Sequence, residues 1–265
     1  MSDVLSRDGL RIHYEVDPPA AAGASGAETV VLLHAAGADA AAWERLGWIE
    51  PLRQAGLRVI RPDARGYGAS DRVADPGLLG GSPCVDDIAS VLDAEGVESA
   101  HLAGYSMGAC HAIRFAEAQP ERVRSLVLGG VIVGALAIQG LHLATEERAE
   151  QQRRVALRQL DGALARLAGP AAEVVRAARE VVRSEPFSRP DLSRAQVPAL
   201  IAAGGDDPAA EPWIREELAR LLPGARVLVL EGRDHVGCLA DPRLRDAVVS
   251  FLDGRRGGPG AGPPL

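Results

Sequence analysis

Short apolar runs rich in β-branched residues recur along the chain, and longer stretches of helical character separate them. From Thr29 onward these runs are nearly continuous, as expected for strands that are covered on both faces of a sheet. Strands that alternate with helices in this way predict βα units and a mainly parallel sheet. The predicted strands are Leu10–Val16, Thr29–His34, Leu57–Pro62, Ala100–Gly104, Ser125–Val131, Leu200–Ala203 and Arg226–Leu230.

Helix start signals lie between these strands. Ser82 and the proline after it are typical of an N-cap with proline at the first helical position, which predicts a helix through Ala94. Asp241 is again followed by proline and predicts a last helix that ends near Leu252. The helix expected after residue 106 should stop before Pro120.

The strand pattern disappears between residues 134 and 192. Charged sequence rich in alanine and leucine replaces it, with breaks at Gly169-Pro170 and at Pro186. We interpret residues 134–192 as a helical cap inserted into one α/β core, whose two parts are residues 1–133 and 193–253. The glycine- and proline-rich residues 254–265 are predicted to be a disordered tail.

Composition and charge exclude several classes of function. The formal net charge of −7 and the absence of a basic cluster disfavour a nucleic-acid partner. The three cysteines Cys84, Cys110 and Cys238 form no Cys-x-x-Cys pair, which argues against a zinc site or a disulfide scaffold and fits a reducing cytoplasm. No secretory signal is visible, and we interpret the uncharged segment Leu126–Ala144 as a buried strand and a pocket lip, not as a membrane span.

The segment Gly104–Gly108 reads Gly-Tyr-Ser-Met-Gly and lies between a predicted strand and a predicted helix. In that context G-x-S-x-G is typical of a nucleophile elbow. The turn is so tight that the serine takes a strained backbone conformation, and side chains two residues away on either side would clash. It places the Ser106 hydroxyl at a helix N-terminus, where backbone N–H groups favour developing negative charge.

Two earlier segments support a family assignment together with this elbow. His34-Ala35-Ala36-Gly37 resembles the oxyanion loop of the α/β-hydrolase superfamily, with alanine at position 35 where glycine is usual. The segment Asp63–Ser70 resembles the D-x-R-G-x-G-x-S segment of the same superfamily. The resemblance implies that the N–H groups of Ala36 and Met107 form an oxyanion hole. We interpret His34 as a brace for its loop, and Asp63 and Arg65 as residues that hold a loop by hydrogen bonds.

The resemblance also implies a mostly parallel eight-stranded sheet flanked by helices, and a catalytic triad in the order serine, acid, histidine. After the predicted strand at residues 200–203, Gly204 and Asp207 match the family's G-x-x-D turn, with Asp206 as an adjacent rival. The residues Glu231–His235 resemble the G-x-G-H turn, which makes His235 the candidate base. In that turn Asp234 replaces the second glycine.

The resemblance implies a serine hydrolase that cleaves an ester, lactone or thioester of a small hydrophobic substrate through an acyl-enzyme on Ser106, with Asp207 and His235 completing the triad. No metal or cofactor is expected. Alternatives within the family are hydrolysis of a C–C bond, a perhydrolase activity, or a biosynthetic acyltransferase or cyclase reaction. A non-catalytic ligand-binding protein is the alternative from another class.

The chain is expected to be a monomer or homodimer. The expected substrate contacts are Ala35, Tyr105, Val131, Leu136, His142 and Val236.

Overall fold

The computed structural model describes residues 1–21, 26–73, 81–132, 190–208 and 210–254, together with residues 75 and 78 and scattered residues between 154 and 183. The scattered residues are helical apart from Ala165, which lies in a turn, as the helical pattern of that segment predicts. Most of the predicted cap and residues 255–265 of the predicted tail lie outside the described residues.

A single eight-stranded sheet runs through the described part of the chain, in the order β1-β2-β4-β3-β5-β6-β7-β8. The first strand pairs antiparallel with β2, and β2 pairs antiparallel with β4. All other neighbours are parallel. The strands are β1 (Ser2–Leu5), β2 (Arg11–Asp17), β3 (Thr29–Leu33), β4 (Arg58–Pro62), β5 (Ala100–Tyr105), β6 (Val123–Gly129), β7 (Ala199–Gly204) and β8 (Arg226–Leu230).

All seven predicted strands are present, with ends within two residues of the prediction. The strand that the pattern did not predict is β1, whose four residues are exposed or half-buried and therefore show no apolar run. It forms a hairpin with β2 at one edge of the sheet. This edge position explains why polar residues are tolerated there.

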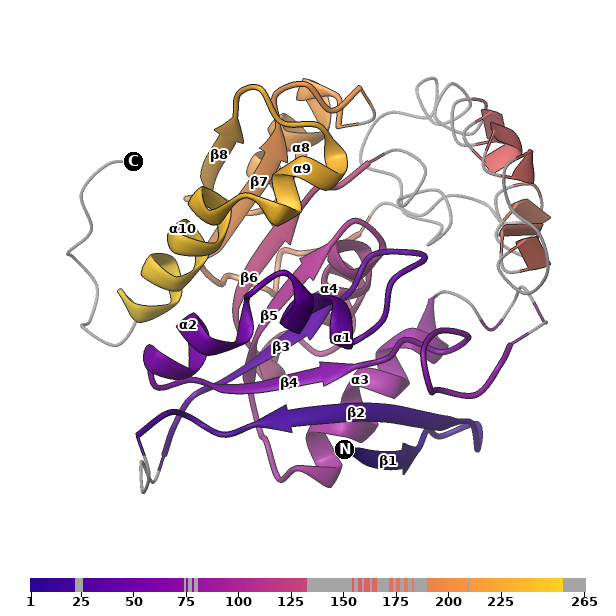
Figure 1. Cartoon of the computed structure of the whole chain (residues 1–265), viewed down its shortest axis with the longest axis vertical. Coiled ribbons are helices and arrows are strands. Elements are labelled where there is room, and N and C mark those ends of the chain that lie inside the picture. The colour runs from indigo at the N-terminus through magenta and orange to yellow at the C-terminus, as the bar shows by residue number, and fades with distance from the viewer. Residues whose placement is uncertain are drawn as a thin grey trace.

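Helices cover both faces of the sheet (Figure 1). They are α1 (Ala41–Arg45), α2 (Ile49–Gln54), α3 (Ser82–Ala94), α4 (Met107–Ala118), α8 (Pro212–Leu221), α9 (His235–Ala240) and α10 (Pro242–Asp253), with a 3₁₀ turn at Pro120–Arg122. The last helix has the predicted cap, because the Asp241 side chain accepts a hydrogen bond from the Arg243 N–H. In α3 the N-cap position is Gly81 with φ +63°, not Ser82 as predicted, and no side chain caps this helix.

Side chains alternate between the two faces of the sheet and build a separate apolar core on each face. Along β3, Val31 and Leu33 pack against α3 and α4 on one face of the sheet. Val30 and Leu32 point to the other face and pack against α2 and α10. All four are at most 4% exposed, and burial of each such side chain stabilises the fold by about 1.5–3 kcal/mol. This double-sided core fixes the strands whose carboxyl ends carry the candidate site.

Within the described ranges, no helix combines the length with the apolar character that a bilayer-spanning segment needs.

Candidate active site

The turn between β5 and α4 holds Ser106 in a strained conformation. Its φ of 55° is positive, a property that no other non-glycine residue of the described chain shares. A Cβ atom at Gly104 would lie 2.2 Å from the carbonyl oxygen of Gly108, and one at Gly108 would lie 2.0 Å from the carbonyl oxygen of Leu33. Both positions therefore require glycine, as the elbow interpretation predicts.

Met107 begins α4, so its N–H lies in the first helical turn, where N–H groups have no partner within the helix. The Ser106 carbonyl accepts hydrogen bonds from the N–H groups of Ala109 and Cys110, which ties the elbow to the helix. The positive end of the helix dipole thus lies beside the serine. This is the position in which an oxyanion would be stabilised.

The loop after β3 is braced by His34. Its Nδ1 lies 2.8 Å from the carbonyl oxygen of Ala35, and its Nε2 lies 2.9 Å from the N–H of Ala64. Because Nε2 accepts from an N–H, the proton is on Nδ1, which donates to Ala35. Burial lowers the pKa of His34, which favours this neutral form. The arrangement supports a structural role for His34, while Ala36 is exposed beside it.

Asp63 holds the neighbouring loop by two hydrogen bonds from backbone N–H groups. One carboxylate oxygen accepts from Ala40 at 2.6 Å and the other from Ala69 at 2.8 Å. The carboxylate packs against Gly68, where a Cβ atom would lie 2.1 Å from it. Asp63 therefore has the loop-holding role that the sequence indicated.

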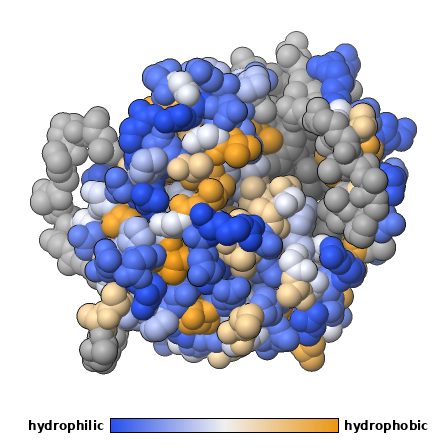
Figure 2. Space-filling model, in the orientation of Figure 1, coloured by the Kyte–Doolittle hydropathy of each residue, from blue (hydrophilic) through white to orange (hydrophobic). Residues whose placement is uncertain are grey.

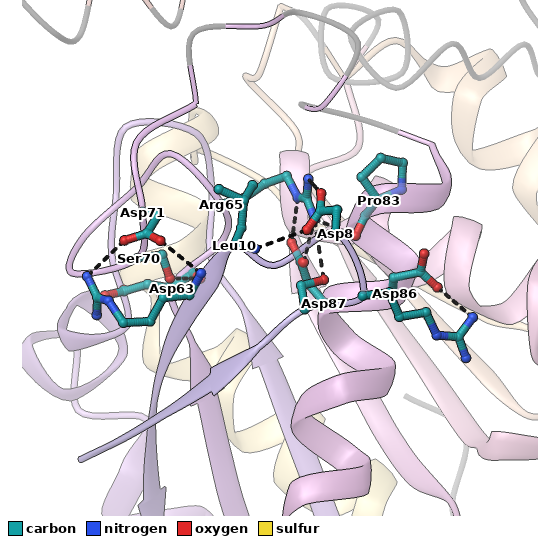
Figure 3. A network of polar contacts seen from close by, with 12 residues as sticks. Asp8, Leu10, Asp63, Arg65, Ser70, Asp71, Pro83, Asp86 and Asp87 are labelled. Atoms are coloured by element: carbon teal, nitrogen blue, oxygen red, sulfur yellow. Dashed lines mark hydrogen bonds and ion pairs between the residues drawn. The ribbon is translucent and has the colours of Figure 1, made fainter.

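Arg65 lies at the centre of a second polar network (Figure 3). Its guanidinium donates two hydrogen bonds to the Asp87 carboxylate, at 2.6 and 2.7 Å, and one to Asp8 at 2.8 Å. A further bond reaches the carbonyl oxygen of Pro83 at 3.1 Å. The side chain of Arg65 is only 1% exposed, so these partners compensate the loss of its hydration. Arg65 thereby connects the β1–β2 turn to the start of α3.

Asp207 and His235 form a direct pair at the ends of β7 and β8. Their Oδ2 and Nδ1 atoms are 2.6 Å apart. The Asp207 side chain is 1% exposed and that of His235 is 28% exposed. Asp206, the rival acid, is exposed to solvent. The structure therefore pairs His235 with Asp207.

Close packing of two loops brings this pair together. A Cβ atom at Gly204 would lie 2.2 Å from the carbonyl oxygen of Arg233, so glycine is required there. That carbonyl also accepts a hydrogen bond from the Asp206 N–H at 3.0 Å. Asp234 caps α9 by accepting from the Gly237 N–H at 2.7 Å. Its φ of −78° is available to any residue, which explains why aspartate can replace the second glycine of this turn.

Tyr105 joins the elbow to the histidine loop. Its hydroxyl donates to the backbone carbonyl oxygen of His235 at 2.6 Å, and the two rings have centroids 5.3 Å apart. The residue directly before Ser106 therefore contacts the candidate base. Three segments that are distant in the sequence thus meet at the carboxyl edge of one sheet.

The predicted substrate contacts differ in their exposure to solvent. Val236, beside His235, is 72% exposed, and hydrophobic residues gather around α9 in Figure 2. Ala35 is half-buried and Val131 is buried. The substrate contacts of these two residues stay predictions. The side chain of Tyr105 is also buried, and its hydroxyl donates to the carbonyl oxygen of His235, so a substrate contact of Tyr105 stays a prediction. Leu136 and His142 lie outside the described residues.

Three residues that shape the site were not predicted from the sequence. Asp87 was not recognised as the partner of Arg65, and Cys238 was not connected to Tyr105. The capping role of Asp234 was also missed. An aspartate directly before a short helical segment is a local N-cap signal, so this role could have been predicted. The other two contacts join distant segments, and no local pattern encodes them.

A comparison with protein families decides the assignment. The sequence model of a family described as "Alpha/beta hydrolase family" matches residues 30–249, which is most of the chain. The chain belongs to the alpha/beta hydrolase family. The fold, the strained elbow and the Asp207–His235 pair are therefore features of an α/β-hydrolase.

Two relatives of this α/β-hydrolase share the name 2-hydroxy-6-oxononadienedioate/2-hydroxy-6-oxononatrienedioate hydrolase. The protein of Cupriavidus pinatubonensis is 43% identical over 110 residues, which is 40% of this chain and 37% of the relative. The protein of Paraburkholderia phymatum is 41% identical over 122 residues, which is 46% of this chain and 40% of the relative. Each match therefore spans less than half the length of the relative.

Solved structures match nearly the whole length of this α/β-hydrolase at lower identity. A thermophilic esterase from Thermogutta terrifontis has a TM-score of 0.68 and 22% identity, with 96% of this chain and 98% of that chain covered. An enol-lactonase from Burkholderia xenovorans has a TM-score of 0.67 and 20% identity, with 97% and 100% covered. At these identities the likeness shows the shared fold.

Proposed function

We propose that this α/β-hydrolase is a serine hydrolase in which Ser106, His235 and Asp207 act on a carbonyl group of a small-molecule substrate. The observation that carries the proposal is the 2.6 Å contact between Asp207 and His235, joined through Tyr105 to a serine in a strained elbow. Strained backbone and a buried carboxylate paired with histidine are typical of catalytic sites.

The reaction starts with proton transfer from Ser106. His235 accepts the hydroxyl proton on Nε2, and the serine oxygen attacks the substrate carbonyl carbon to form a tetrahedral intermediate. The N–H groups of Met107 and Ala36 donate to the oxyanion. The bond to the leaving group then breaks, and His235 returns the proton to that group. Water, deprotonated by the same imidazole, hydrolyses the acyl-enzyme and regenerates Ser106.

Asp207 supports each of these proton transfers. Its carboxylate accepts from Nδ1–H of His235, which leaves Nε2 free to take the serine proton. The negative charge also stabilises the imidazolium that forms during the reaction. Because the Asp207 side chain is buried, this interaction is only weakly screened by solvent.

An ester, lactone or thioester with a hydrophobic acyl part is the substrate class that we propose first. The exposed apolar side chain of Val236 beside His235 supports a contact with such an acyl group. Among proteins of the same fold are a thermophilic esterase and an enol-lactonase.

Hydrolysis of a C–C bond is the second candidate, and the names of the two relatives favour it. In that reaction the same serine attacks a ketone carbonyl, and the carbon leaving group departs with the electron pair of the broken bond and gains a proton. The elbow and the triad would serve both reactions. The difference between them lies in the leaving group and in the surface that binds it.

The experiment compares the two substrate classes on the same enzyme. Turnover of p-nitrophenyl acetate and butyrate is measured beside that of a 2-hydroxy-6-oxo-dienoate, and a fluorophosphonate adduct is located by mass spectrometry. We expect an adduct on Ser106, and activity that Ser106→Ala abolishes. Ser250→Ala, on α10, is the matched control and should keep full activity. Activity that survives Ser106→Ala would overturn the proposal, and the preferred substrate separates the two candidates.

A further inference from the structure

Tyr105 lies between the candidate nucleophile and the candidate base. It is the last residue of β5, directly before Ser106, and it is 2% exposed. Its hydroxyl donates to the carbonyl oxygen of His235, 130 residues further along the chain, at 2.6 Å. The two rings are 5.3 Å apart and tilted by 51°. Both the ring and the hydroxyl of Tyr105 therefore contact the residue that would act as base.

Two glycines at the end of β6 make room for this ring. A Cβ atom at Gly129 would lie 2.6 Å from Tyr105 Cδ2, and one at Gly130 would lie 2.5 Å from Tyr105 Cζ. Any side chain at these positions would displace the ring or strain the backbone, and Gly130 also has φ +56°. The ring is thus held in a slot that glycine permits.

The hydroxyl of Tyr105 stays protonated and can therefore donate a hydrogen bond. Burial, followed by the proximity of Cys238 and Asp207, raises the pKa of Tyr105 well above its ordinary value. Cys238, three residues after His235 in α9, interacts with the same hydroxyl. The indole N–H of Trp48 donates to the carbonyl oxygen of Leu239 at 3.3 Å and holds α9 from another element.

We propose that Tyr105 is a positioning residue for His235, which fixes the imidazole relative to Ser106 and Asp207. The inference rests on the proposed function, in which His235 is the base. A base must stay within hydrogen-bond reach of its proton donor, and small displacements reduce the rate strongly. Because the hydroxyl ties the His235 backbone to the strand that ends directly before Ser106, base and nucleophile are held as one unit.

The test removes only the hydroxyl, in Tyr105→Phe. Loss of one hydrogen bond should lower kcat by about five- to tenfold and leave KM within about twofold. In the same variant the His235 Nδ1 proton, observed by NMR, should exchange with water faster than in the wild type. Faster exchange reports a loosened contact with Asp207, and a purely structural role of the hydroxyl would not change it.

Tyr14→Phe is the matched control. Tyr14 lies on β2 and is also buried, at 3% exposure. Its hydroxyl donates to the Glu95 carboxylate at 2.7 Å. Both variants lose one part-buried hydrogen bond of similar length, so both should lower the melting temperature. Only Tyr105→Phe should change kcat and the Nδ1 exchange rate. Equal kcat and equal exchange in the two variants would overturn the proposal.

Two measurements keep this inference separate from the proposed function. If the wild type forms no Ser106 adduct and hydrolyses no substrate, the proposed function fails, and the Nδ1 exchange rate alone then decides the role of Tyr105. If Tyr105→Phe does not fold, nuclear Overhauser contacts between the rings of Tyr105 and His235 are measured in the wild type. Strong contacts support the proposal, and their absence overturns it.

Discussion

His111 lies five residues after Ser106 in α4, and its side chain is 5% exposed. Among the described residues its Nε2 has no hydrogen-bond partner, and it lines a small cavity with His34 and Asp63. Burial, with smaller contributions from His34 and Arg65, lowers the pKa of His111 from 6.5 to about 3. Between these two values the unfolded chain binds a proton that the folded protein does not bind. The free energy of unfolding therefore falls as the pH decreases from 6.5 towards 3.

His111→Leu should remove this dependence. The side chains are similar in size, and loss of the unpartnered nitrogen should raise the free energy of unfolding at pH 7 by about 1 kcal/mol. Between pH 7 and pH 5 the wild type should lose about 2 kcal/mol more than the variant. Urea unfolding of both proteins at the two pH values measures this difference. An identical pH dependence would show that His111 does not titrate as its burial predicts.

The sequence only partly predicts which of the adjacent residues Asp207 and Asp206 pairs with His235. The register of the turn favours Asp207, because Gly204 lies three residues before it. The decisive fact is spatial, since Asp207 is buried against His235 and Asp206 is exposed. Which carboxylate points inward depends on the packing of two loops that are distant in the sequence, and no local pattern contains that information.

At the scale of elements, α3 presents two adjacent aspartates in different environments. Asp87 pairs with Arg65, and the two side chains are 8% and 1% exposed. Asp86 pairs with Arg7, and these side chains are 27% and 66% exposed. Figure 3 shows the two aspartates next to each other on α3. A buried charge without its partner destabilises a protein strongly, whereas an exposed pair contributes little.

Asp87→Ala should therefore lower the free energy of unfolding by about 3–5 kcal/mol, because it leaves Arg65 buried with one carboxylate fewer. Asp86→Ala, the adjacent control, should lower it by less than about 1 kcal/mol. Thermal and urea unfolding of the two variants compare them directly. Similar losses in both would contradict a bracing role for the Arg65–Asp87 pair.

The elements that the sequence could predict share a strong apolar pattern. The central strands β3 to β7 are buried on both faces, so their hydrophobic runs were visible without a structure. The edge strand β1 has no such run and was missed. The start of α3 was predicted one residue too late, with Ser82 as the N-cap, because Gly81 with positive φ takes the N-cap position and Ser82 is already helical.

For the whole molecule, the parallel order β5-β6-β7-β8 places three chain segments at one edge of the sheet. Parallel neighbours end at the same edge, so Ser106 after β5, Asp207 after β7 and His235 after β8 come together although 100 residues lie between the first two. The family motifs predicted this convergence. They did not predict the contact of Tyr105 with His235, because the hydroxyl reaches a backbone atom that any residue would supply.

Asp207→Asn should lower kcat by about a hundredfold or more, because an amide cannot fix the tautomer of His235 or stabilise the imidazolium. Asp206→Asn changes the adjacent exposed side chain in the same way and should keep kcat within about twofold. Steady-state kinetics with the preferred substrate compares the two. A larger loss in the Asp206 variant would reverse the assignment of the acid.

In the proposed mechanism Ser106 and His235 act as one catalytic unit, and double-mutant kinetics of kcat/KM show whether they do. Ser106→Ala and His235→Ala should each lower kcat/KM by about a thousandfold or more. The kcat/KM of the double variant should lie within about threefold of that of the less active single variant. A double variant whose loss equals the product of the two single losses would show that Ser106 and His235 act independently, and would rule out the proposed mechanism.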